Sequence, residues 1–120
     1  MTKKITHPDI FDRAIQLAKK SCMTQQHAAI IVKDREIIAE GINHHISYFE
    51  HQYSIHAEVD ALSQIKYLSP KFIQDCTMLV VRVGPKSRNY PIRNSKPCEN
   101  CAKAIQNYGI KKVFYSTDLF

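Results

Sequence analysis

The sequence lacks a long apolar run, a secretion signal and internal repeats, and each absence excludes a class of protein. No stretch approaches the ~20 apolar residues that a membrane-spanning helix needs. The N-terminal residues 1–5 include two lysines, but they are not followed by the apolar segment of a secretion signal. We therefore expect a cytoplasmic protein with no membrane partner. In that compartment the four cysteines are thiols or metal ligands rather than a disulfide framework.

Acidic residues are missing from one long stretch, between Asp75 and Glu99, although the bulk composition is ordinary for a globular protein. The length of 120 residues predicts a single domain over 1–120, and the net charge of +6 favours anionic partners. The acid-free stretch holds five basic residues: Arg82, Lys86, Arg88, Arg93 and Lys96. It is either a solvated loop or a rim that attracts phosphate.

Hydrophobic periodicity predicts an α/β protein. The expected order is α, β, β, α, β, α, β, over residues 6–20, 28–32, 37–39, 56–68, 77–83, 98–108 and 112–115. Thr6 and Ser54 are the expected N-caps of the first two helices, and Gly109 is the expected C-cap of the last. Residues 44–54 and 84–97 read as loops. Strand–helix–strand alternation in the second half implies parallel pairing, and hence a sheet with helices on both faces.

Two short motifs carry the candidate chemistry, His56-Ala57-Glu58 and Pro97-Cys98-Glu99-Asn100-Cys101. Two cysteines three residues apart at a helix start lie on one side, where the positive end of the helix dipole favours the thiolates that zinc requires. With His56 they would supply three ligands. A metal with three protein ligands keeps a fourth position open for water, which distinguishes a catalytic zinc from a structural one.

Glu58 is the candidate general base and then general acid, because it is a carboxylate beside the ligands that does not bind the metal itself. On a regular helix His56 and Glu58 would be separated by about 200°, and so would not share a face. We therefore expect the metal to lie off the end of the helix, where groups around the first turn converge.

Two other interpretations compete with a catalytic zinc, namely a redox site and a structural zinc site. A Cys-x-x-Cys motif also occurs in redox sites, although the preceding loop, rich in proline and basic residues, suits a thioredoxin-like unit poorly. A structural zinc would need a fourth protein ligand, for which the sequence offers Cys22, Cys76, His44, His45 and His51.

Taken together, the motifs make the chain resemble the zinc-dependent cytidine and deoxycytidylate deaminase superfamily, from about Ala28 to Tyr115. The resemblance implies a three-layer α/β/α sandwich around a mixed four- to five-stranded sheet. It also implies Zn2+ held by His56, Cys98 and Cys101, proton transfer by Glu58, and hydrolytic release of ammonia.

The resemblance extends to the substrate and the assembly. Asn43 matches a position that holds the sugar or base, although a turn residue is the alternative, and the backbone of Ala57 would contact the base. Arg88 and Arg93 are our preferred phosphate contacts, because the guanidinium offers a planar fork. Relatives also lead us to expect a homo-oligomer.

The expected substrate is a cytosine-containing nucleoside or nucleotide, which would be converted to the uracil product. One alternative is a deaminase of nucleic acid, acting on tRNA adenosine or on single-stranded DNA or RNA cytosine, which the basic stretch would attract. Another is a zinc-stabilised binding module without turnover. Two features leave the subfamily open: the long basic loop over 84–96, and a fifth strand after residues 112–115 that is expected to be short or absent.

Overall fold

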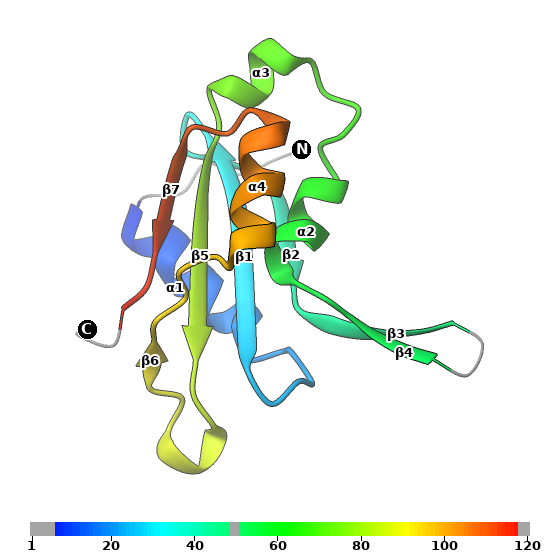
Figure 1. Ribbon diagram of the computed structural model, residues 1–120. Coiled ribbons are helices and arrows are strands. Elements are labelled where there is room, and N and C mark those ends of the chain that lie inside the picture. Colours follow the sequence, from blue (N-terminus) through cyan, green and yellow to red (C-terminus); the bar gives the residue numbers. More distant parts are fainter. Residues whose placement is uncertain (1–6, 49–50, 118–120) are drawn as a thin grey trace.

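The computed structural model describes residues 7–48 and 51–117, and a mixed five-stranded sheet forms its centre (Figure 1). The strands are β1 (Gln26–Lys33), β2 (Glu36–Ile42), β5 (Thr77–Val83), β6 (Ile92–Arg93) and β7 (Lys112–Tyr115). Strand β1 is antiparallel to both β2 and β5. On its other side, β5 pairs antiparallel with β6 and parallel with β7, as the strand–helix–strand pattern predicts.

Helices cover both faces of this sheet. Helix α1 (His7–Ala18) packs on one face, while α2 (Ala57–Ser63) and α4 (Glu99–Tyr108) pack on the other (Figure 1). Each face has its own apolar cluster, one around Ile30 and Val81 under α1, and one around Ile31 and Val80 under α2 and α4. The predicted three-layer α/β/α sandwich is confirmed.

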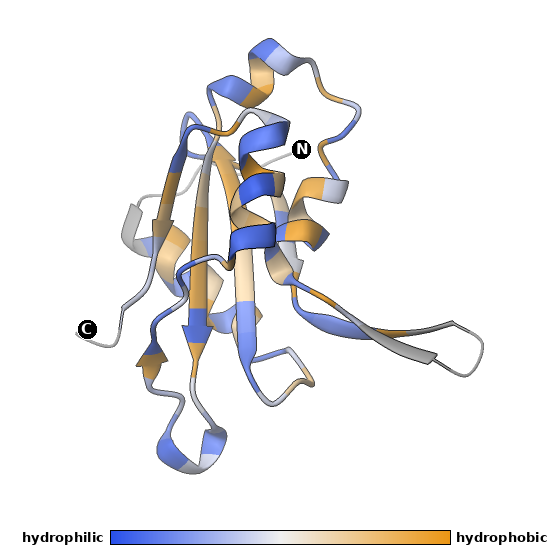
Figure 2. Cartoon of the chain, viewed as in Figure 1, coloured by the Kyte–Doolittle hydropathy of each residue, from blue (hydrophilic) through white to orange (hydrophobic). Residues whose placement is uncertain are grey.

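Strand β5 sends alternate side chains to the two layers, as a strand buried on both faces must. Met78 and Val80 belong to the cluster under α2 and α4, whereas Val81 and Val83 belong to the cluster under α1. By the same alternation Arg82 lies on the α2/α4 side. Figure 2 shows that β1 and β5 are apolar over most of their length and become hydrophilic at the end of the sheet near β6.

Several predicted boundaries are correct and others are not. The strands over 77–83 and 112–115 have the bounds that were expected, and α1 lies within the predicted 6–20, although Thr6 is outside the described residues. The helix expected over 56–68 ends at Ser63, and a separate helix α3 (Pro70–Gln74) follows. Ser69 caps α3 by accepting a hydrogen bond from the Phe72 N–H at 3.2 Å.

The prediction of a loop over 44–54 is wrong. Strands β3 (His44–Tyr48) and β4 (His51–Ile55) form an antiparallel hairpin that projects from the body of the molecule (Figure 1). These strands pair with each other and not with the central sheet, so neither face needs the apolar alternation by which strands are recognised. The predicted loop over 84–97 also holds structure, a 3-10 turn η1 (Lys86–Arg88) and β6. None of the described helices is long and apolar enough to cross a membrane.

Candidate active site

The two motif cysteines begin helix α4, as predicted. Cys98 is the N-cap, with an extended backbone (φ −66°, ψ 166°), and its Sγ accepts a hydrogen bond from the Cys101 N–H at 3.5 Å. Cys101 lies in the first turn and is buried. Gly109 ends the helix with φ 97°, a left-handed conformation that glycine adopts without steric cost. The cap signals therefore bring both thiols to one end of α4.

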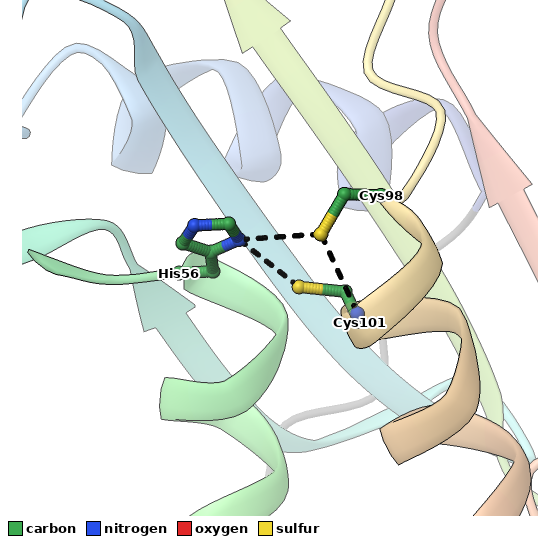
Figure 3. Close-up of side chains that lie close together, drawn as sticks. All are labelled: His56, Cys98 and Cys101. Atoms are coloured by element: carbon green, nitrogen blue, oxygen red, sulfur yellow. Dashed lines mark hydrogen bonds between the residues drawn. The ribbon is translucent and has the colours of Figure 1, made fainter.

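His56 faces these thiols from the start of helix α2 (Figure 3). It is the N-cap of α2, in place of the expected Ser54, and its backbone is extended (φ −74°, ψ 150°). Its Nδ1 lies 3.1 Å from Cys101 Sγ and 3.7 Å from Cys98 Sγ. Atoms of the three side chains that can ligate a metal all lie within 4.8 Å of one another. One imidazole and two thiols at this separation fit Zn2+, which prefers nitrogen and sulfur ligands.

No fourth ligand joins this cluster among the described residues. Cys76 is buried in the apolar core and Cys22 is exposed, and neither belongs to the cluster. The same holds for His44 and His45, while the His51 side chain lies outside what the structure describes. Within these bounds the cluster has the three ligands of a catalytic zinc rather than the four of a structural one.

Glu58, the second residue of α2, is 5 % exposed and lines the same cavity as His56 and Cys98. Burial raises the pKa of its carboxyl group. That rise is opposed by its own backbone N–H, by the charge of His56 and by a side-chain hydrogen bond with Cys101. Because His56 precedes the helix in an extended conformation, the 200° helical separation does not apply. Both residues line the cavity at the beginning of α2.

The Cys101 thiol has a pKa well above its usual range, first because it is buried and then because of the negative charge of Glu58. A thiol in that state is protonated at neutral pH. A cation held by the cluster reverses this preference, because metal ligation requires the thiolate.

Gly41 allows the start of α2 to lie directly on strand β2. A Cβ atom at this position would be 2.4 Å from the Ala57 carbonyl oxygen and 2.5 Å from the Ala61 nitrogen, both of them backbone atoms. The Asp60 carboxylate also accepts a hydrogen bond from the Ile42 N–H at 3.1 Å. This bond gives one backbone N–H group of β2 a partner on α2. The position of His56 and Glu58 therefore depends on a glycine outside both motifs.

Two buried serines secure the segment that leads into Pro97, and no motif in the sequence predicted them. Ser95 Oγ donates to the Val80 carbonyl oxygen at 2.7 Å and accepts from the Ser116 N–H at 2.8 Å. Ser116 Oγ donates to the Arg93 carbonyl oxygen at 2.7 Å. Since buried hydroxyls require such partners, the pair ties the ends of β6 and β7 to the middle of β5. The sequence signal was weak, two isolated serines beside predicted strands.

A cavity of about 270 Å³ opens beside the cluster. It is lined by predicted residues, His56, Ala57, Glu58, Cys98 and Asn43, and by residues that were not predicted as site residues, among them Gln25, His27, Arg82 and Lys96. Three larger hollows, of about 480, 630 and 680 Å³, contain neither a ligand of the cluster nor Glu58. Chemistry, rather than size, therefore locates the site.

The predicted substrate contacts differ in their surroundings. The Asn43 side chain accepts a hydrogen bond from the His27 N–H at 2.9 Å and donates to the Gln25 carbonyl oxygen, so it secures backbone at the cavity wall. Arg93 lines an adjoining hollow of about 480 Å³. Arg88 lies exposed on η1 and lines neither this hollow nor the site cavity.

Comparison with known proteins agrees with this geometry. Residues 4–117 match the cytidine and deoxycytidylate deaminase zinc-binding region. The chain belongs to this family. It is accordingly a deaminase, acting on the amino group of a nucleobase. Its family binds zinc, and the cluster of His56, Cys98 and Cys101 is able to hold a metal ion.

Solved structures resemble the deaminase over most of its length. The apo dCMP deaminase of cyanophage S-TIM5 is 25 % identical, with a TM-score of 0.60, and the match covers 92 % of this chain and 84 % of that one. A diaminohydroxyphosphoribosylaminopyrimidine deaminase/reductase of Thermotoga maritima is 26 % identical, with a TM-score of 0.54, and the match covers 89 % of this chain but 28 % of that one. No match was found among curated protein sequences.

Proposed function

We propose that this deaminase hydrolyses the amino group of a cytosine-containing nucleoside or nucleotide, giving the uracil product and ammonia. The observation that carries the proposal is the meeting of a three-donor cluster with a buried carboxylate, Glu58, that is not one of the donors, in one cavity. The likeness to a protein described as a dCMP deaminase supports cytosine as the base.

In this proposal His56, Cys98 and Cys101 hold zinc. When bound, zinc supplies a nucleophile at neutral pH by lowering the pKa of a water molecule from 15.7 to roughly 7. Glu58 accepts the proton from that water as a general base. As a general acid it delivers this proton to the ring nitrogen. It then takes the second proton from the hydroxyl group newly bonded to the ring carbon and delivers it to the amine, which leaves as ammonia.

The surroundings of Glu58 suit this double role. Burial raises the pKa of its carboxyl group from the ordinary value, and a carboxyl group whose pKa lies nearer neutrality exchanges protons in both directions more readily. Ala57, which is fully buried, lies between His56 and Glu58 in the sequence and lines the same cavity, so its backbone would face a base held there.

The test is a substrate panel. Zinc-loaded protein is incubated with cytosine, cytidine, deoxycytidine, CMP, dCMP, single-stranded oligodeoxycytidine and tRNA, and ammonia release and the ultraviolet shift are followed. We expect turnover of a free cytosine nucleoside or nucleotide. Uracil formed only in the oligonucleotide, or inosine formed in the tRNA, would replace the proposal with a nucleic-acid deaminase. A protein that binds zinc and converts nothing would overturn it.

A homo-oligomer and a cytoplasmic location stay predictions. Size-exclusion chromatography with light scattering checks the first, for which we expect a mass of at least two chains. Fractionation of the source cells checks the second.

A further inference from the structure

Three basic side chains form a row across the sheet beside the candidate active site. Arg82 on β5 is the register partner of His27 on β1 and of Arg93 on β6. Residues directly opposite each other in antiparallel strands share one face of the sheet. Since Arg82 lies on the face of Met78 and Val80, the whole row lies on the α2/α4 side, where the metal cluster is. The register therefore gathers three basic groups that are scattered in the sequence.

No carboxylate in the described part of the protein forms an ion pair with this row. The Nε atom of Arg82 is buried and has no hydrogen-bond partner there. No ion pair among the described residues involves Arg82 or Arg93. Like charges placed directly opposite each other destabilise a sheet, and a buried donor without a partner also has a cost. An anion at this position would reduce the repulsion between the like charges and would accept a hydrogen bond from the unpaired donor.

The row stands between two hollows. Arg82 and Gln25 line both the 270 Å³ cavity that contains His56 and Glu58 and the 480 Å³ hollow lined by Arg93. A ligand whose base lies beside Glu58 therefore reaches Arg82 where the first cavity meets the second. A guanidinium group fits a phosphate with two parallel hydrogen bonds, a match that a lone ammonium group cannot make.

We propose that Arg82, supported by Arg93, binds the 5′-phosphate of the substrate, so that the enzyme selects nucleoside monophosphates over free nucleosides. This inference rests on the proposed function and narrows its substrate class. Arg82 is then a specificity-determining residue, and it is one that residue type alone did not distinguish among the five basic residues between Asp75 and Glu99. Its role follows from strand register and from the orphaned Nε.

The experiment measures binding as well as turnover. Calorimetry compares dUMP with deoxyuridine on zinc-loaded wild type, Arg82→Gln and Lys86→Gln, and dCMP with deoxycytidine is compared by kcat/KM. Lys86→Gln is the matched control. The substitution removes one positive charge from the same basic stretch, and Lys86 lines neither hollow. We expect wild type to prefer dUMP to deoxyuridine, and Arg82→Gln to lose at least about tenfold of that preference, since hydrogen bonds to charged groups are the strong ones. Lys86→Gln should keep the preference.

If Arg82→Gln does not fold, Arg82→Lys carries the test, since it keeps the charge and loses the planar fork, and we expect it to retain only part of the preference. Equal binding of dUMP and deoxyuridine by wild type would overturn the inference, as would an unchanged preference in the folded Arg82 variants. Turnover of deoxycytidine and dCMP at equal kcat/KM would refute the phosphate subsite while leaving the proposed function intact. Tight dUMP binding without turnover of any cytosine compound would refute the proposed function while leaving the phosphate subsite intact.

Discussion

Replacing Gly41 with alanine should damage the active site from outside it. The added Cβ would lie 2.4 Å from the Ala57 carbonyl oxygen and 2.5 Å from the Ala61 nitrogen. Both are backbone atoms of α2, so no side chain can rotate to make room. The first turn of α2, together with His56 and Glu58, must move away from β2.

The size of the effect follows from these distances. Ordinary van der Waals contact begins at 3.4 Å, so the Ala57 carbonyl must retreat by about 1 Å. Overpacking of this kind typically costs about 1–3 kcal/mol of stability. A displacement of 1 Å in catalytic groups can cost about 10²-fold in rate. We therefore expect Gly41→Ala to fold with a lowered Tm and to deaminate dCMP about 100-fold more slowly than wild type.

Gly109→Ala is the matched control. Gly109 has φ +97°, so alanine strains the backbone there by about 1–2 kcal/mol, but the nearest atom to its Cβ would be Gln74 Cγ at 3.9 Å, which is ordinary contact. This glycine lies at the opposite end of α4 from Cys98. The two variants should lose similar stability, and only Gly41→Ala should lose activity and zinc affinity out of proportion. If both variants deaminated dCMP at rates within threefold of each other, our account of how α2 is positioned would be wrong.

Three further predictions concern single side chains. Glu58→Gln should retain zinc and lose at least about 100-fold in kcat, because general acid–base groups contribute about 10²–10⁴-fold; near-normal ammonia release by the zinc-loaded variant would remove Glu58 as the proton carrier. Cys98→Ser should lose bound zinc in metal analysis, whereas Cys22→Ser, at an exposed cysteine outside the cluster, should keep it; equal zinc contents would contradict the ligand set. Burial first, and the charge of Arg82 second, lowers the pKa of His27 from the ordinary 6.5. The unfolded chain therefore binds a proton at His27 more tightly than the folded chain does. As a result, His27 lowers the free energy of unfolding as the pH falls below 6.5. Arg82→Gln should raise the pKa of His27 in an NMR titration. An unchanged or lowered pKa would contradict the electrostatic interaction between Arg82 and His27.

Much of the fold was predictable because strong local signals agreed with the tertiary structure. The β-branched run over 77–83 became the central strand, which is buried on both faces. Cys98 and Gly109 mark the two ends of α4 by their cap geometry. The convergence of His56, Cys98 and Cys101 was predictable for the same reason, because each motif lies at the start of a helix and the two helix starts lie close together.

What the sequence did not reveal depends on contacts between distant segments. In the part of the chain that the structure describes, β3 and β4 pair with each other and not with the central sheet, so pairing within that sheet does not impose a period on them. The space that Gly41 leaves for α2 is a packing relation, which no spacing rule records. The row of His27, Arg82 and Arg93 exists only through the register of three strands. Arg88 and Arg93 were preferred on residue type, whereas strand register singles out Arg82.

X-ray absorption at the zinc edge of the purified protein would count the atoms around the metal and so show whether one ligand position is left for solvent. We expect one zinc per chain, with two sulfur neighbours at about 2.3 Å and two lighter neighbours at about 2.0–2.1 Å. The sulfurs are those of Cys98 and Cys101, one lighter atom is a nitrogen of His56, and the other is solvent oxygen. A third sulfur, or a chain that binds no zinc, would contradict this expectation.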